Sequence, residues 1–261
     1  MAKVIVIANQ KGGVGKTTTV INLAHALSLK GKEVLIIDLD PQGQVATFLG
    51  MEQSSGAFYL LSAAVDPHRN ALMVIQQQIR FTGRKNLYLI GGNPLTNMAQ
   101  TMLNASNAPI SVVRKVLEPI VLNNKGPDYI VIDTAPSVGG VQERAVWAAD
   151  YVIIPTTPDS SSLQGVRYIV GLGKSLRDQH WSGRIFGILP TKYEERTKES
   201  KSSMRELRRV FGNILLLPIS DRTVLRDAHA RGQTIFEFDP ASQSAEEYTR
   251  LAGLVIKTDK E

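Results

Sequence analysis

The sequence predicts a doubly wound α/β fold, with a mainly parallel sheet of about seven or eight strands flanked by helices. Short apolar runs rich in Val and Ile recur along the chain, and helical stretches separate most of them. Strands that alternate with helices imply parallel pairing through right-handed crossovers. Three of the runs end in a glycine-rich loop or an aspartate. Ligands of such sheets gather at the carboxyl edge, where these groups would lie.

Seven segments are expected to be strands. They are Lys3 to Ala8, Glu33 to Asp38, Asn86 to Ile90, Asp128 to Asp133, Tyr151 to Pro155, Arg184 to Leu189 and Ile214 to Leu217. The segment from Gln44 to Phe81 is expected to be mostly helical, with breaks at residues 54–56 and 66–67. With 261 residues, 43% of them hydrophobic, and no convincing linker or repeat, we expect residues 1–261 to form one domain with one sizeable core.

The first strand runs into a glycine-rich loop. Residues 9–19 read Asn-Gln-Lys-Gly-Gly-Val-Gly-Lys-Thr-Thr-Thr, and apolar residues then recur at helical spacing. Glycines at such a strand-to-helix turn bring several backbone N–H groups toward one phosphate, and the helix adds the positive end of its dipole. Lys16 can reach the outer phosphates, and the Thr17 hydroxyl can ligate magnesium. The loop therefore predicts a nucleotide site.

This loop departs from the general Gly-x-x-x-x-Gly-Lys-Thr pattern, because Gln10 stands where a glycine is expected and Lys11 adds a second lysine. Residues 11–18, Lys-Gly-Gly-Val-Gly-Lys-Thr-Thr, resemble the deviant Walker A motif of the ParA/MinD ATPases. The resemblance implies that Lys11 crosses a dimer interface to the partner's nucleotide, as a positive charge for phosphoryl transfer. Taken alone, Lys11 could equally be a solvated loop lysine or make only a local phosphate contact. The implied nucleotide contacts are Lys11, Gly12, Gly13, Val14, Gly15, Lys16, Thr17 and Thr18.

Two further strands end in carboxylates. The second is followed by Asp38-Leu39-Asp40-Pro41, and strand alternation would point Asp38 and Asp40 the same way. By resemblance, Asp38 supports the metal and Asp40 orients or activates the attacking water, so that Lys11, Lys16 and Asp40 form the catalytic set. The run at residues 129–133 has the Walker B form, which assigns Asp133 to magnesium with Thr17 and Asp38. Residues 134–140 would be the switch segment that senses the γ-phosphate.

Nucleotide identity is expected to be ATP, because no Asn-Lys-x-Asp guanine signature is present. In the ParA/MinD family the adenine lies against loops after late strands, here residues 190–193 and 218–221. Thr191 and Pro218 are the expected base neighbours.

Positive charge is concentrated late in the chain. Residues 184–231 contain 11 basic and 6 acidic residues, whereas residues 232–261 contain 3 basic and 6 acidic residues. A helix is expected to carry the densest part, and its candidate DNA contacts are Lys198, Lys201, Arg205, Arg208 and Arg209. Such a cluster suits phosphate-backbone contacts without base readout. The alternative is a solvated face neutralised by the interleaved Glu194, Glu195, Glu199 and Glu206.

Composition excludes some kinds of site and indicates where in the cell the protein acts. No cysteine is present, which excludes disulfides and a cysteine-ligated iron–sulfur cluster. No long apolar run or signal peptide appears, so we expect a cytoplasmic protein. Near the C-terminus, an apolar stripe includes Tyr248, Leu251, Ala252 and Val255. Few basic residues flank it, so a helix packed on the protein body is favoured over the membrane helix that ends MinD-like relatives.

Over essentially the whole chain, the sequence is similar to the small Soj-like ParA partitioning ATPases, without an N-terminal helix-turn-helix domain. The resemblance implies a magnesium-dependent ATPase that is weak without its partner. An ATP-dependent homodimer would bind nonspecific DNA on the nucleoid, and a ParB-like partner would stimulate hydrolysis to release it. Three alternatives stay open: a MinD-like membrane ATPase for division-site placement, a ParA-like system positioning a protein cargo, and a small-molecule enzyme using the same loop.

Overall fold

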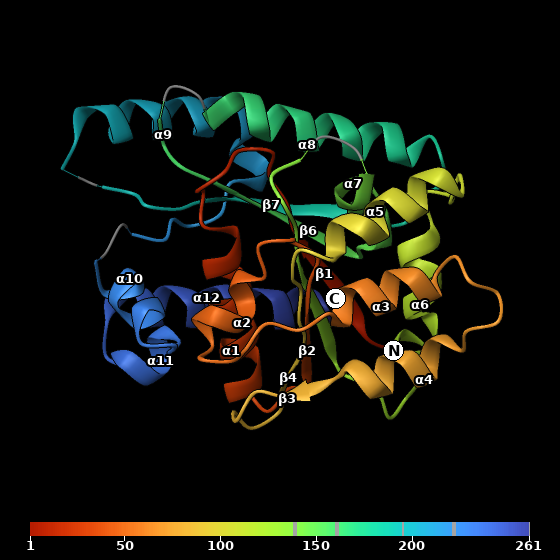
Figure 1. Cartoon of the computed structure of the whole chain (residues 1–261). Coiled ribbons are helices and arrows are strands. Elements are labelled where there is room, and N and C mark those ends of the chain that lie inside the picture. The colour runs from red at the N-terminus through yellow and green to blue at the C-terminus, as the bar shows by residue number, and fades with distance from the viewer. Residues whose placement is uncertain (138–139, 160–161, 195, 221–222, 261) are drawn as a thin grey trace.

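A seven-stranded sheet forms the centre of the computed structural model, and helices cover both of its faces (Figure 1). The structure describes residues 1–137, 140–159, 162–194, 196–220 and 223–260. The strand order is β3-β4-β2-β5-β1-β6-β7, and every pair is parallel except β3 with β4. The strands are β1 (Lys3–Ile7), β2 (Val34–Asp38), β3 (Arg80–Phe81), β4 (Leu87–Ile90), β5 (Tyr129–Asp133), β6 (Tyr151–Thr156) and β7 (Arg184–Pro190). The predicted doubly wound fold is confirmed.

Strand alternation divides the core in two. Along β1, Val4 and Val6 belong to one apolar cluster, whereas Ile5 and Ile7 belong to the other. Helices α3 (Gly56–Ala63), α4 (Ala71–Gln78), α5 (Thr96–Ala105), α6 (Val112–Val121), α7 (Gly140–Ala148) and α8 (Ser162–Arg177) cover the first face. Helices α1 (Lys16–Leu29), α2 (Gln44–Phe48), α10 (Thr223–Ala230), α11 (Ile235–Phe238) and α12 (Gln243–Thr258) cover the second. Because both faces are covered, the inner strands are apolar at nearly every position.

One predicted strand is wrong. Ile214 instead ends a short 3-10 helix, Gly212–Ile214. The next residue, Leu215, forms only an isolated bridge with Ile188. Leu216 donates its N–H to the Ile188 carbonyl at 2.8 Å, but the next donor needed for a parallel ladder falls on Pro218, which has none. The seventh strand is β3, a two-residue antiparallel segment too short to leave a periodic pattern.

The last helix packs as expected. In α12, Tyr248, Leu251, Ala252 and Val255 are buried against the second face of the sheet, beside α1. None of the helices that the structure describes is both long and apolar enough to cross a bilayer.

Candidate functional site

The glycine-rich loop joins β1 to α1 at the carboxyl edge of the sheet, where it was predicted. Gly13 and Gly15 have φ values of 71° and 81°, in the left-handed region that favours glycine. Asn9 shapes the loop, since its Oδ1 accepts the Lys11 N–H at 3.0 Å and its Nδ2 donates to the Pro155 carbonyl at 2.7 Å. The N-cap residue of α1 is Gly15, which has no side chain to cap the first turn. The N–H groups of this turn therefore remain available to an anion.

Lys16 and Thr17, the first residues of α1, point their polar groups into the site. Lys16 is buried, and its Nζ donates to the Lys11 carbonyl at 3.2 Å. Burial lowers the pKa of Lys16, although the nearby charges of Asp133 and Asp40 act in the opposite direction. The Thr17 hydroxyl donates to Asp133 Oδ2 at 2.7 Å.

Asp38 and Asp133 end adjacent strands and are register partners in the sheet. Both are buried. Burial, reinforced by the charge of Asp133, raises the pKa of Asp38 well above its usual range. Burial also raises the pKa of Asp133 to about 7, against the hydrogen bond from Thr17. A cation beside these carboxyls would relieve the mutual repulsion. Magnesium is commonly held by one or two carboxylates with phosphate oxygens and water, and the adjacent Thr17 and Asp133 oxygens fit that pattern.

The two aspartates after β2 occupy different environments. The oxygens of Asp38 accept backbone N–H groups of Asp40 at 3.0 Å and Val45 at 3.2 Å, so this carboxyl braces the loop from within. Asp40 lines a cavity, with Oδ1 accepting the Gln42 N–H at 2.9 Å. The strand ends at Asp38, so alternation does not govern the direction of Asp40.

Lys11 contacts its own chain. Its Nζ donates to Thr157 Oγ1 at 3.1 Å and to Asp159 Oδ2 at 2.5 Å, both in the loop after β6. The side chains of Lys11 and Asp159 are about one-third exposed. Lys11 therefore lies at the rim of the loop, and its action on a partner's nucleotide stays a prediction.

The predicted switch segment, residues 134–140, is tied to the phosphate loop by Gln142. This buried side chain donates to the Ala135 carbonyl at 2.8 Å and to the Asn9 carbonyl at 3.4 Å. Thr134 donates to the Ile7 carbonyl at 2.9 Å. Residues 138 and 139 lie outside the described residues. Sequence reasoning missed Gln142, because a glutamine early in a helix carries no signal of such a contact.

A cavity of about 390 Å³ extends from the phosphate loop between α1, α2 and α10. That size suits a small-molecule ligand. Thr191 lines the cavity, but its hydroxyl donates to the Val14 carbonyl at 2.8 Å. Pro218 is not a lining residue, whereas Ile219 and Ser220 after it are. Asp221, in the same predicted loop, lies outside the described residues.

Part of the cavity wall was not predicted from the sequence. Phe48 of α2, Leu225, Arg226 and His229 of α10 and Tyr248 of α12 all line the cavity. The rings of Phe48 and His229 stack with centroids 4.2 Å apart and planes inclined by 9°. Burial lowers the pKa of His229 to about 4, so its ring is neutral at physiological pH. The sequence offered no signal, since α2 and α10 are short and lie far apart along the chain.

The basic segment forms α9 (Lys198–Phe211), as expected. Met204 and Leu207 are buried, while the five candidate DNA contacts are exposed at spacings that place them on another face: Lys198, Lys201, Arg205, Arg208 and Arg209. Among the described residues, none of the five forms an ion pair. Glu195, one of the acidic residues expected to neutralise them, lies outside that part of the chain.

Known proteins resemble this chain along nearly its whole length. The family model of the AAA domain (AAA_31) matches residues 2–182. The chromosome-partitioning ATPase Soj of Thermus thermophilus is 32% identical over 254 residues, covering 97% of this chain and 94% of that protein. The structure of apo McdA from Cyanothece has a TM-score of 0.85 at 23% identity, covering 98% of this chain and all of that one. Cobyrinic acid a,c-diamide synthase from Mycobacterium smegmatis, bound to ADP and magnesium, has a TM-score of 0.80 at 25% identity, covering 100% and 96%.

Proposed function

This chain belongs to the ParA/MinD family of P-loop ATPases, and from that premise we propose that it is a DNA-partitioning ATPase whose ATP-bound dimer binds DNA without sequence specificity. The chain binds ATP and Mg²⁺, as the nucleotide and magnesium complexes of similar structures indicate. We further propose that residues 1–261 act as one ATPase domain.

We propose a role for each site residue, and the position of each residue supports it. The N–H groups of the phosphate loop and the buried Lys16 ammonium bind the phosphates, while Thr17 and Asp133, with Asp38 beside Asp133 in the sheet, would hold Mg²⁺, which would neutralise developing charge on the phosphoryl oxygens. Asp38 braces the loop that presents Asp40 to the cavity. Asp40 then orients the attacking water and accepts its proton.

The exposed basic face of α9 carries the assignment to DNA. Its five cationic side chains lie in solvent without ion-pair partners among the described residues, and the helix is anchored beneath them by Met204 and Leu207. Cations presented in this way bind phosphates regardless of base sequence, because the affinity comes from counterion release.

Dimerisation supplies the switch. Lys11 of each protomer engages the partner's nucleotide, so ATP joins two copies and brings two α9 faces onto one duplex. DNA affinity falls steeply when half of the phosphate contacts are lost, so hydrolysis releases the protein. Hydrolysis is slow alone, and a ParB-like partner bound to the cargo accelerates it.

The rival functions make different demands. A MinD-like membrane role needs an exposed apolar stripe on the last helix, but Tyr248, Leu251, Ala252 and Val255 are buried. The structural similarity to cobyrinic acid a,c-diamide synthase raises the alternative of a small-molecule enzyme. Such an enzyme would use the same phosphate loop without needing the α9 face. Positioning of a protein cargo would use the same DNA switch.

Co-sedimentation tests these functions directly. Protein with ATP, ADP or no nucleotide is mixed with nonspecific duplex DNA or with anionic vesicles. We expect retention on DNA with ATP and little with ADP. Equal retention with both nucleotides would contradict the switch. Retention on vesicles alone would favour the membrane role, and hydrolysis stimulated by a metabolite but not by DNA would favour the enzyme.

A further inference from the structure

The segments that follow α2 and α10 contact each other through a glycine on each side, Gly50 and Gly232. Gly50 and Gly232 have φ values of 71° and 66°, and a Cβ on Gly232 would lie 2.5 Å from the Gly50 Cα. Real Cβ atoms do not approach another atom so closely, so a side chain at Gly232 would push the two segments apart, whereas a Cβ at Gly50 would lie 3.1 Å from the Gly232 carbonyl oxygen and need only a small shift. The stacked rings of Phe48 and His229 lie just before this contact along each segment. The meeting point therefore adjoins the wall of the nucleotide cavity.

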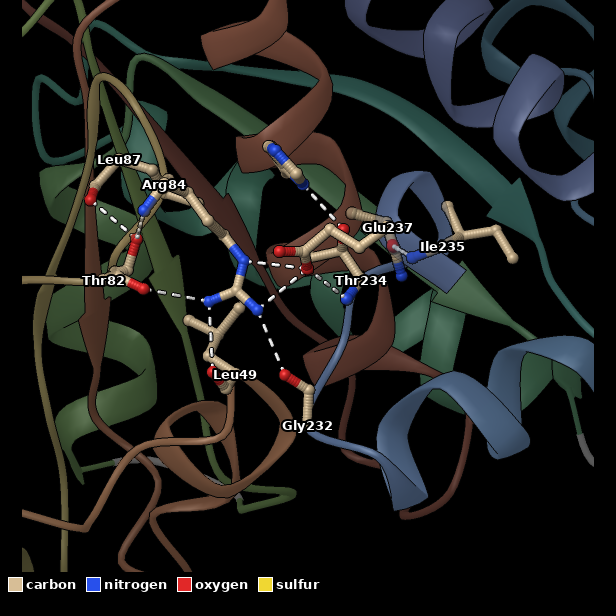
Figure 2. Close-up of polar contacts among 10 residues, drawn as sticks. Leu49, Thr82, Arg84, Leu87, Gly232, Thr234, Ile235 and Glu237 are labelled. Atoms are coloured by element: carbon tan, nitrogen blue, oxygen red, sulfur yellow. Dashed lines mark hydrogen bonds and ion pairs between the residues drawn. The ribbon is translucent and has the colours of Figure 1, made fainter. Parts of the chain in front are cut away.

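Arg84 joins the two segments (Figure 2). It lies in the loop between β3 and β4, and its side chain is only 9% exposed. One Nη1 hydrogen bond goes to the Leu49 carbonyl and one Nη2 hydrogen bond to the Gly232 carbonyl, at 3.1 and 3.0 Å. The remaining donors reach the Thr82 carbonyl at 3.1 Å and Glu237 Oε2 at 2.8 and 2.9 Å. The guanidinium thus makes four hydrogen bonds and, through Nη2, an ion pair with Glu237.

The same cluster is anchored on the helix that follows the phosphate loop. Glu237 also accepts the Thr234 N–H at 2.8 Å, as part of a capping box at the start of α11. The Thr234 hydroxyl lies 2.6 Å from His25 Nδ1, and the Ile235 N–H donates to Asn22 Oδ1 at 2.9 Å. His25 and Asn22 belong to α1. Arg84 therefore links α1, α2 and α10, three of the helices around the cavity, without lining the cavity itself.

We propose that Arg84 is a positioning residue of the nucleotide site, which sets the affinity for the nucleoside part by holding the α2 and α10 walls together at the Gly50–Gly232 contact. When the phosphates occupy the loop at residues 12–18, the nucleoside is left with the rest of the cavity, whose lining includes Phe48, Leu225 and His229 as well as Thr191, Lys192, Ile219 and Ser220. Of these, Phe48, Leu225 and His229 lie on the two helices that Arg84 joins. The proposal rests on nucleotide binding at this site and is independent of DNA.

The prediction concerns binding more than chemistry. Removing the guanidinium frees the carbonyls of Leu49 and Gly232 and lets the walls separate, while the phosphate loop, Asp40 and Asp133 keep their own contacts. Affinity for ATP and ADP should therefore fall, whereas affinity for inorganic tripolyphosphate should not. The hydrolysis rate at saturating ATP should change little.

The test uses two independent ways of loosening the contact. Arg84→Met removes the donors, and Arg84→Lys restores the charge and some of them. Gly232→Ala instead forces the segments apart. Arg69→Met, at an exposed ion pair with Asp66, is the control for the first change. Gly31→Ala is the control for the last, because Gly31 has a φ of +80° but no atom within 4 Å of an added Cβ.

Dissociation constants for ATP, ADP and tripolyphosphate, each with Mg²⁺, are measured at a temperature where circular dichroism shows every variant folded. We expect roughly tenfold weaker nucleotide binding in Arg84→Met and Gly232→Ala, a smaller loss in Arg84→Lys, unchanged tripolyphosphate binding, and turnover at saturation within about twofold of wild type. Nucleotide affinities within twofold of wild type, or equal losses for tripolyphosphate and ATP, would overturn the proposal. Failure of the wild-type protein to bind ATP would instead refute the nucleotide site.

Discussion

The ammonium of Lys11 lies 2.5 Å from Asp159 Oδ2 of its own chain, so the lysine proposed to act across a dimer is held locally in the single protomer. Thr157 also accepts from Lys11, at 3.1 Å. Both side chains of the ion pair are partly exposed, and such pairs contribute about 1 kcal/mol or less. A partner's nucleotide can therefore compete for Lys11 at small cost.

Asp159→Asn should make Lys11 easier to release. Because the lost ion pair opposes dimerisation, we expect the ATP-dependent dimer to form up to about fivefold more tightly. Light scattering across a protein concentration series measures this. Asp66→Asn, which breaks an exposed pair with Arg69 on another part of the surface, is the control and should leave dimerisation unchanged. A weaker dimer in Asp159→Asn would mean that Asp159 supports the dimer instead of competing with it.

Lys16→Ala should remove nucleotide binding. The ammonium is buried beside the phosphate loop, where its Nζ donates to the Lys11 carbonyl. Loss of such a charge-assisted contact should weaken ATP binding by roughly 100-fold or more. Titration of a fluorescent ATP analogue gives the affinity. Near-normal binding would place the phosphates elsewhere.

Asp40 should be needed for hydrolysis and not for binding. In Asp40→Ala we expect ATP to bind, hydrolysis to fall by roughly 100-fold or more, and the dimer to accumulate because it no longer turns over. Asp40→Asn keeps an oxygen that can accept the Gln42 N–H, so it separates loop structure from proton transfer. Rapid single-turnover hydrolysis by Asp40→Asn would remove the carboxylate from its proposed role.

Because Asp38 and Asp133 are buried side by side, we expect the stability of the nucleotide-free protein to depend on pH. The folded-state pKa of Asp133 is raised to about 7 from 3.8. The stability that this carboxyl contributes is thus present at low pH and is lost as pH rises through about 7. Without nucleotide or magnesium, the free energy of unfolding of Asp133→Asn should exceed that of wild type by roughly 1 to 3 kcal/mol at pH 8. At pH 5 this difference should be smaller. Urea unfolding at both pH values measures this difference.

His25 and His229 act in the opposite direction, because burial lowers both pKa values to about 4. Their contribution to stability is lost as pH falls from about 6.5 to about 4. It is common to wild type and Asp133→Asn and cancels in the comparison. A stability difference that does not vary with pH would show that Asp133 titrates normally.

Much of the site could be predicted from sequence because its parts end strands of one parallel sheet. The phosphate loop, Asp38 and Asp133 each follow a short apolar run, and parallel pairing brings their carboxyl ends together. The basic face of α9 was predictable for a similar reason, since helical spacing alone separates it from Met204 and Leu207. Local patterns suffice where the fold supplies the long-range placement.

The remaining parts depend on contacts that leave no local pattern. Arg84 and the glycines at 50 and 232 are ordinary loop residues in sequence. Their role comes from contacts with Gly232, which lies 148 residues after Arg84 and 182 residues after Gly50. The predicted strand at residues 214–217 was wrong because its apolar residues do not by themselves ensure pairing with a neighbouring strand. Pro218 has no N–H group, so the row of backbone hydrogen bonds to β7 stops after Leu216. The cavity wall from α10 was not predicted either, because it too depends on contacts between segments far apart in the sequence.

Reversing charge on α9 should weaken DNA binding and spare the ATPase core. For Arg205→Glu, Arg208→Glu and Arg209→Glu combined, we expect at least about tenfold weaker DNA binding with ATP at 150 mM salt, and unchanged ATP-dependent dimerisation. Reversal of Lys30, Lys85 and Lys125, which are exposed elsewhere, changes the net charge equally. An equal loss of affinity in both triple variants would indicate a general charge effect and no specific surface on α9.

The salt dependence of DNA binding tests the central claim most directly. Dissociation constants for a nonspecific duplex are measured between 50 and 300 mM salt, each with Mg²⁺ and ATP, with ADP, or without nucleotide. If ATP joins two α9 faces on one duplex, the slope of log affinity against log salt with ATP should be about twice the slope with ADP, and the affinity should be higher. Equal slopes and equal affinities in the three nucleotide states would contradict the account.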